Sequence, residues 1–219
     1  MFAELRRWVQ GLRGQREETR DGVQRWIMLD VETTGLDPRS DQLLAIAAVA
    51  LRFTPTTQRL ELSVGDSFEI VLRQESPSGK DNILIHHIGV QAQSDGCAPE
   101  QALEEFRRWV GTAPLLAFHA AFDQTMIERA FQRFHLPPLA NEWLDIEPIA
   151  RLVGANSTAR ALDDWLRHFG IECAVRHQAA SDAFATAELL LRLWPATRKE
   201  ASSWSQLRKL ARHAAWIPR

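Results

Sequence analysis

Four acidic residues and one histidine, spread over three segments of the chain, are of the types that metal-assisted chemistry requires. Asp30 and Glu32 stand at the end of an apolar run, Asp123 follows a second apolar run, and His177 precedes Asp182 by five positions. Carboxylates that a fold brings together repel one another unless a cation lies between them, and hard divalent ions are the usual cation. Two such ions about 4 Å apart are the standard arrangement for hydrolysing a phosphodiester. The sequence therefore offers the donors of a two-metal hydrolytic site.

The spacing of the carboxylates indicates which elements carry them. Asp30 and Glu32 are two positions apart on a predicted strand, so they share one face of it, although a lone D-x-E pair is also typical of a solvated strand end. Asp123 opens a predicted helix, where the helix dipole alone would favour an acidic residue. Asp182 lies among small residues at helical spacing, which would let its helix approach the sheet closely and bring Asp182 to Asp30.

These segments resemble the motifs of the DEDDh 3′–5′ exonucleases, whose best-known member is the proofreading epsilon subunit of bacterial DNA polymerase III. The resemblance extends from about Arg25 to Trp194. The first motif is Leu29–Leu36, which reads L-D-V-E-T-T-G-L, and the third is His177 followed five positions later by Asp182.

The second motif is a partial match to the family. Phe122 and Asp123 agree with it, but Phe118 and His119 stand where the family usually has His-Asn. A sister group of these exonucleases has a tyrosine in place of the motif histidine, and the chain contains no tyrosine. The resemblance is therefore to the histidine type, with His177 as that histidine.

The resemblance implies a role for each reactive residue. Asp30, Glu32 and Asp182 ligate a first Mg²⁺ or Mn²⁺ ion, and Asp30 bridges to a second ion that Asp123 helps to hold, directly or through a water. His177 takes the proton of the attacking water, because imidazole titrates near neutral pH. The product is a nucleoside 5′-monophosphate.

The resemblance also implies which residues lie near the substrate. Thr33, Thr34 and Leu36 contact the terminal nucleotide, and Phe122 is expected in the core at the edge of the substrate site. The segment 86–89, which reads H-H-I-G, resembles the family's His-Gly-Ile segment and is expected to be structural or close to the substrate. It is not expected to bind a metal, because adjacent side chains on a strand point to opposite faces.

Composition limits the class of protein. The chain has 219 residues and a net charge of −2, which does not favour a tight, non-specific binder of duplex nucleic acid. Its two cysteines, Cys97 and Cys173, lack a C-x-x-C pair and any spacing typical of a zinc site, and as unpaired thiols they are typical of a reducing compartment. The start lacks the apolar core of a secretory signal and no stretch could span a bilayer, so we expect a cytoplasmic protein without membrane contact.

The apolar pattern predicts an α/β fold. A three-strand meander is expected first, and alternating helices and strands follow it. The expected strands are 25–31, 43–51, 67–72 with 60–64 in the same hairpin, 113–118 and 143–145, and the expected helices are 99–110, 121–134, 147–153, 159–169 and 178–194. Residues 74–81 are expected to form a loop. This order predicts a ribonuclease H-like mixed sheet flanked by helices.

Three parts are expected along the chain: an N-terminal helical extension at 1–22, an exonuclease domain at 23–194 and a basic amphipathic C-terminal tail at 195–219. One hypothesis is that the tail contacts a nucleic acid or a partner protein. The other is that it packs on the domain as an ordinary helix, and the sequence does not decide between the two.

The sequence thus predicts a metal-dependent 3′–5′ exonuclease that acts on single-stranded DNA 3′ ends in proofreading, repair or end processing. One alternative is an RNA exonuclease of the same family. Contacts near the 2′-hydroxyl distinguish RNA from DNA, and the motifs do not determine which residues make those contacts. A catalytically inert polymerase-associated module is disfavoured, because all five reactive residues are present. The chain could act alone or beside a DNA polymerase or another replication or repair protein.

Overall fold

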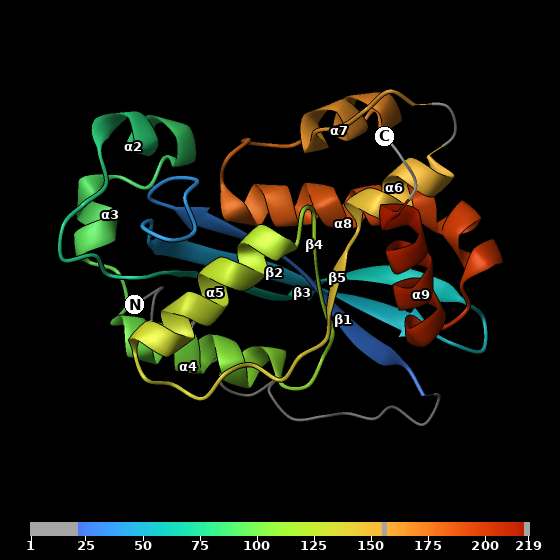
Figure 1. Ribbon diagram of the computed structural model, residues 1–219, viewed down its shortest axis with the longest axis horizontal. Coiled ribbons are helices and arrows are strands. Elements are labelled where there is room, and N and C mark those ends of the chain that lie inside the picture. The colour runs from blue at the N-terminus through green and yellow to red at the C-terminus, as the bar shows by residue number, and fades with distance from the viewer. Residues whose placement is uncertain (1–21, 155–156, 217–219) are drawn as a thin grey trace.

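The computed structural model describes residues 22–154 and 157–216, which form a mixed sheet with helices on both faces (Figure 1). The extension expected at 1–22 lies outside the described residues except for its last position, and so do residues 217–219 of the expected tail. Among the described residues, none of the helices has the length and hydropathy of a membrane span.

The sheet has five strands in the order β3-β2-β1-β4-β5. They are β1 (Gln24–Thr33), β2 (Leu43–Thr54), β3 (Arg59–Val71), β4 (Leu115–Ala117) and β5 (Trp143–Asp145). The first three pair antiparallel as a meander, whereas β4 pairs parallel with β1 and β5 parallel with β4. The predicted meander is therefore confirmed, with the two pieces expected at 60–64 and 67–72 joined in one strand, β3.

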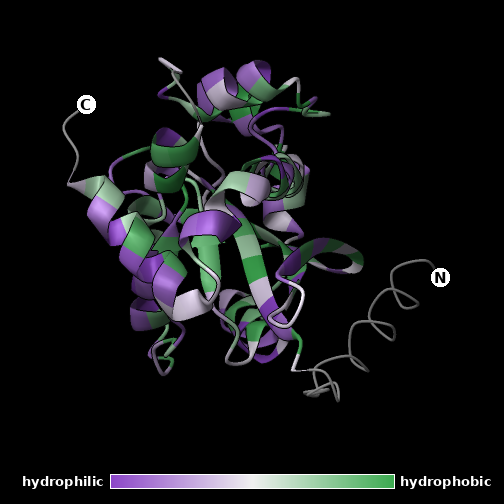
Figure 2. Cartoon of the chain, turned by 90° about the vertical axis from the view of Figure 1, so that its right-hand side faces the viewer, coloured by the Kyte–Doolittle hydropathy of each residue, from purple (hydrophilic) through white to green (hydrophobic). Residues whose placement is uncertain are grey.

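The central strand β1 alternates between two hydrophobic cores. Trp26 and Met28 are buried in one core, while Ile27 and Leu29 are buried in the other. This alternation follows from the two-residue period of a strand, and it requires a layer of helices on each face of the sheet. Figure 2 shows the hydrophobic strands in the interior, enclosed by helices with hydrophilic outer faces.

Eight helices are described. They are α2 (Lys80–His86), α3 (Val90–Ser94), α4 (Pro99–Val110), α5 (Ala121–Arg133), α6 (Glu147–Val153), α7 (Leu162–Phe169), α8 (Ala179–Glu200) and α9 (Trp204–Ala215). In Figure 1, α8 runs along one face of the sheet, and α4 and α5 lie along the other. Helices α4, α5 and α6 begin where predicted and α8 begins one residue later, whereas α7 begins at Leu162 and not at residue 159.

Helices α2 and α3 were not predicted. The loop expected at 74–81 ends where α2 begins at Lys80, and the strand expected around residues 86–89 is wrong because His86 ends α2. His87 caps that helix with φ 60°, in the left-handed region. Seven and five residues are too short for a hydrophobic period to identify a helix, so this error has a simple physical cause.

Helix α8 continues through Pro195 to Glu200, so its expected end at Trp194 is wrong. A proline inside a helix costs about 3 kcal/mol because it removes one hydrogen bond and crowds the preceding turn. Here Leu193, Trp194 and Thr197 are all buried, and this packing holds the helix together across the exposed proline.

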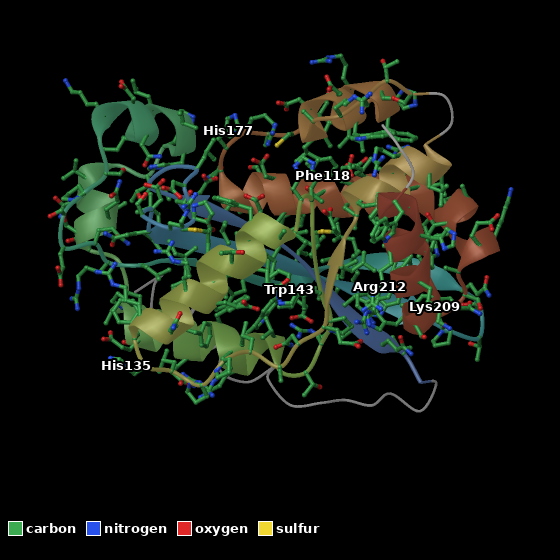
Figure 3. The ribbon with its side chains drawn as sticks, in the orientation of Figure 1. Phe118, His135, Trp143, His177, Lys209 and Arg212 are labelled. Carbon is green, nitrogen blue, oxygen red and sulfur yellow. The ribbon has the colours of Figure 1, made fainter. Side chains whose placement is uncertain are left out.

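Helix α9 packs back onto the domain. Leu207, Ala211 and Ala214 are buried on its inner side, and Arg151 of α6 donates to the Ala214 carbonyl at 3.3 Å. Lys209 and Arg212 lie on its outer side, where both are labelled in Figure 3. This part of the expected tail thus contributes to the hydrophobic core, and the boundary expected at 194/195 falls inside α8.

Candidate active site

The carboxylates of the first and third motifs meet at the end of β1. Asp30, Glu32 and Asp182 each present a carboxylate oxygen, and these oxygens lie within 4.8 Å of one another. Asp182 is in the first turn of α8, and the small residues Ala179 and Ala183 beside it are buried. The small side chains allow the helix to lie close to β1, as the sequence predicts.

Asp123 reaches the same place from the other face of the sheet. It lies in the first turn of α5 and is 5% exposed. Its charge is one cause of the raised pKa of Asp30, so the two carboxylates interact, although Asp123 lies outside the three-carboxylate cluster. The structure therefore brings together all four acidic residues of the three motifs.

Three of these carboxyls, those of Asp30, Glu32 and Asp123, have raised pKa values. Burial, followed by repulsion from Asp182, raises the pKa of Glu32 to about 8. Burial is also the main reason why the pKa of Asp123 rises to about 8, while backbone N–H groups act in the opposite direction. The pKa of Asp30 is raised well above its ordinary value by burial and then by the charges of its three acidic neighbours. A bound cation would act against these shifts, because it favours the ionised form of Asp30, Glu32 and Asp123.

The donor set fits hard divalent ions. One carboxylate oxygen of Glu32, Oε1, is buried and has no hydrogen-bond partner. A buried acceptor left without a donor costs about 1–3 kcal/mol, and a bound cation would remove that cost. The site offers only carboxylate oxygens from Asp30, Glu32 and Asp182, which is the ligand type that Mg²⁺ and Mn²⁺ prefer.

A sequence profile of the exonuclease family RNase_T matches residues 27–190, which span every motif described above. The chain belongs to this exonuclease family. The predicted DEDD-type exonuclease is thereby confirmed at the level of the family.

Relatives of this exonuclease include much longer proteins. DNA polymerase III of the PolC type from Staphylococcus haemolyticus is 27% identical over 168 residues, which cover 77% of this chain and 11% of the relative. The PolC-type enzyme of Staphylococcus aureus matches with the same identity and coverage. The chain thus spans about a tenth of the length of these relatives.

Solved exonucleases share the fold. A structure of exonuclease I superimposes with a TM-score of 0.65 and 19% identity, covering 81% of this chain and 44% of that one. Exonuclease X in complex with 5′ overhanging duplex DNA gives a TM-score of 0.63 and 18% identity, covering 85% and 99% of the two chains. The predicted ribonuclease H-like fold is therefore confirmed.

His177 lies beside the carboxylate cluster of the exonuclease but not in it. It is exposed, its φ is 59°, and its backbone N–H donates to Asp182 Oδ2 at 2.9 Å. Figure 3 shows it on the segment that leads into α8, on the side toward α2. A positive φ at a non-glycine residue is uncommon and is held by its surroundings, here by the bond to Asp182.

The turn that follows Glu32 lies next to the carboxylate cluster and is held by side-chain hydrogen bonds. The hydroxyl of Thr33 donates to the Gly35 carbonyl at 2.6 Å, and that of Thr34 donates to Asp41 Oδ1 at 2.8 Å. A Cβ atom at Gly35 would lie 2.6 Å from Asp41 Oδ2, so a larger residue there would have to displace the Asp41 carboxylate that bonds Thr34. Leu36 follows and is 86% exposed. The threonine hydroxyls thus hold the turn and leave the Leu36 side chain exposed on it.

Arg129 of α5 ties the same turn to the helix that carries Asp123. Its guanidinium donates to the Arg39 carbonyl at 2.7 Å and to the Asp41 carbonyl at 3.2 Å, and it also contacts the Pro38 carbonyl. The sequence contains no signal for this role of Arg129, because no spacing rule connects an arginine on a helix with carbonyls some 90 positions away.

A hydrogen-bonded relay connects α2 to the end of β1. The Ile88 N–H donates to His86 Nδ1 at 2.9 Å, so we assign the ring proton to Nε2, which donates to Asn82 Oδ1 at 2.7 Å. Asn82 Nδ2 then donates to the Thr33 carbonyl at 3.0 Å. Burial lowers the pKa of His86, in keeping with a neutral ring. This relay is the structural role of the segment at 86–89, and it places α2 beside the site.

Asp145 supports the second motif where the family's asparagine is absent. Its Oδ1 accepts the N–H of His119 at 2.9 Å and that of Glu147 at 3.0 Å. His119 has φ 60°, and its carbonyl accepts the N–H of Phe122, the second residue of α5, which is partly buried against the hydrophobic core. The predicted strand at 143–145 was the only signal for Asp145, and its role depends on the parallel pairing of β5 with β4.

Proposed function

We propose that this chain is a metal-dependent 3′–5′ exonuclease that releases nucleoside 5′-monophosphates from the 3′ ends of single-stranded DNA. The observation that carries the proposal is the cluster of Asp30, Glu32 and Asp182, whose oxygens lie within 4.8 Å of one another with a buried, unpartnered oxygen on Glu32. Family membership supports hydrolysis of a nucleic acid from an end, and the cluster supports the use of divalent ions.

The acidic residues and His177 have different roles in the proposed reaction. Asp30, Glu32 and Asp182 would hold one Mg²⁺ or Mn²⁺ ion, and Asp30 with Asp123 would hold the second. When bound, two such ions polarise the scissile phosphate, activate water and neutralise the leaving 3′ oxygen. His177 accepts the proton of the attacking water, since it is exposed and its backbone N–H is bonded to Asp182 of the cluster.

Exposed apolar side chains around the cluster support a single-stranded substrate. Leu36 is 86% exposed on the turn, Leu84 and Ile85 on α2 are 70% and 53% exposed, and Val90 on α3 is 55% exposed. The relay from α2 to Thr33 keeps α2 next to the end of β1, and Leu36 follows that end along the chain. Unpaired bases expose apolar faces that can pack on such side chains, whereas bases in a duplex bury those faces.

Structural neighbours support DNA as the substrate. Exonuclease I of E. coli has been solved with a dT13 oligonucleotide, and exonuclease X with 5′ overhanging duplex DNA. We extend the preference for a DNA end to this chain. The PolC-type relatives support a working place beside a DNA polymerase or another replication or repair protein. The two cysteine thiols and the absence of a disulfide between them support the cytoplasm.

The test is a matched pair of 5′-labelled oligonucleotides, one DNA and one RNA, incubated with the protein and Mg²⁺ or Mn²⁺. We expect the DNA to shorten from its 3′ end in single-nucleotide steps and the RNA to shorten more slowly. A terminal 3′ phosphate should slow the reaction strongly. Faster digestion of the RNA would assign the chain to RNA processing, and cutting of a closed circular single strand would show an endonuclease instead.

A further inference from the structure

Arg176 joins a metal-site carboxylate to a carboxylate outside the site. Its guanidinium contacts Asp163 Oδ1 of α7 through Nε and Asp182 Oδ1 of α8 through Nη1. The side chain of Asp182 is 6% exposed, that of Arg176 is 27% exposed and that of Asp163 is 50% exposed. We call this arrangement, Asp163–Arg176–Asp182, the Arg176 bridge.

The bridge engages the carboxylate that would bind a metal. Asp182 Oδ1 accepts from Arg176 and, at 3.3 Å, from the Cys173 thiol, while Oδ2 accepts the N–H of His177 at 2.9 Å. All three donors come from the segment between α7 and α8. Both oxygens of Asp182 are therefore already bonded to protein donors, and a cation that binds Asp182 must share or displace them.

The charge of Arg176 also reaches the rest of the cluster. It lowers the pKa of Asp30 and Glu32, against the larger effects of burial and neighbouring carboxylates that raise both values. A divalent cation would act in the same direction and would repel the guanidinium. Arg176 and a metal ion thus compete for the same carboxylates, and Asp163 is the neighbouring acceptor that can keep the guanidinium when the metal is bound.

We propose that Arg176 is the counter-ion of the metal-free site, bound to Asp182 until a divalent cation replaces it, after which Asp163 alone holds the guanidinium. Arg176 is then a positioning residue that acts through Asp182. Because His177 is the next residue and bonds to the same carboxylate, loading of the metal also releases the segment that carries His177. This inference rests on the metal site of the proposed function.

Substitutions at Arg176 and at Asp163 should change the affinity for a divalent metal ion in opposite directions. Removal of the guanidinium in Arg176→Gln eliminates the competitor, so Mn²⁺ should bind about tenfold more tightly, which corresponds to about 1.4 kcal/mol. Removal of the outer acceptor in Asp163→Asn leaves Asp182 as the main partner of the guanidinium, so Mn²⁺ should bind about threefold more weakly, within the usual range for a partly exposed ion pair.

Two further variants separate the bridge from a general effect of charge. The double variant Arg176→Gln/Asp163→Asn should bind Mn²⁺ like Arg176→Gln, because Asp163 is connected to Asp182 through the guanidinium. Asp164→Asn is the matched control: Asp164 is the adjacent acid on α7, but it pairs with Arg167. It should leave the affinity of the wild type unchanged.

The experiment is calorimetric titration of the metal-stripped full chain with Mn²⁺, together with thermal unfolding in EDTA and in Mn²⁺. Arg176→Gln should lower the Tm in EDTA more than in Mn²⁺, and Arg176→Lys should restore most of the wild-type affinity. Additive effects in the double variant, equal effects of Asp163→Asn and Asp164→Asn, or weaker binding by Arg176→Gln would each overturn the inference. A wild type that binds no Mn²⁺ would overturn the proposed metal site as well, which distinguishes the two failures.

Discussion

Without divalent ions, the stability of this protein should fall as the pH rises from 7 to 8. The pKa of Glu32 is raised from 4.5 to about 8, and that of Asp123 from 3.8 to about 8. Each carboxyl keeps its proton in the folded state at a pH where the unfolded chain has lost it. The folded state therefore binds more protons, and its stability is present at low pH and is lost as the pH rises through about 8.

The magnitude follows from these two values. A bound proton corresponds to about 1.4 kcal/mol per pH unit, and a group with a pKa of about 8 is on average about three-quarters protonated between pH 7 and 8. Each carboxyl thus contributes about 1 kcal/mol to the loss, and the pair about 2 kcal/mol. A loss of about 2 kcal/mol is measurable against the free energy of unfolding of a whole domain, which is typically about 5–15 kcal/mol.

The assay is urea unfolding of EDTA-treated protein at pH 7 and pH 8, repeated in Mn²⁺. The window avoids His86, whose lowered pKa gives the opposite dependence, stability lost as pH falls, only below about 6.5. We expect Mn²⁺ to abolish the loss, and Asp30→Asn to raise the stability at pH 8 in EDTA. Stability that is unchanged or higher at pH 8 without metal would refute the buried, mutually repelling cluster.

Three other outcomes are expected. His177→Ala should slow single-turnover cleavage by roughly 10²–10⁴-fold and leave Mn²⁺ binding unchanged. His119→Ala should slow cleavage much less, since the hydrogen bond from His119 to Asp145 is made by its backbone N–H. If His119→Ala is the slower of the two variants, the assignment of His177 as the general base is wrong. Gly35→Ala should weaken oligonucleotide binding, as its Cβ would clash with the Asp41 carboxylate, and unchanged binding would show that the turn is adaptable. Leu207→Ala should lower the unfolding free energy by about 2–5 kcal/mol, and a change below about 1 kcal/mol would favour α9 as a separable tail.

The elements that carry the reactive residues could be predicted from the sequence because their signals are local. The two-residue spacing of Asp30 and Glu32 places them on one face of a strand, and the small residues around Asp182 indicate a helix that lies close to it. The role of Asp123 could not be separated from simple helix capping by the sequence alone. Its interaction with Asp30 arises only because α5 begins at the edge of the sheet where β1 ends.

The residues that support the site were not predictable, because their partners are distant in the sequence. Asp145 and Arg129 act through backbone groups of other segments, and no side-chain pattern marks such contacts. Helix α2 depends on the relay through His86 rather than on an apolar period. Arg176 stands next to His177 and yet its bond to Asp163 depends on how α7 lies against α8.

The most direct test of the central proposal is digestion of a 5′-labelled single-stranded DNA by the wild type and by Asp30→Ala, each with Mg²⁺ and with excess EDTA. The wild type with Mg²⁺ should give a ladder that shortens from the 3′ end and releases nucleoside 5′-monophosphates. Asp30→Ala should remain folded, because it removes one of several mutually repelling carboxylates, and should leave the DNA intact. Full activity of Asp30→Ala, or of the wild type in EDTA, would contradict the two-metal account.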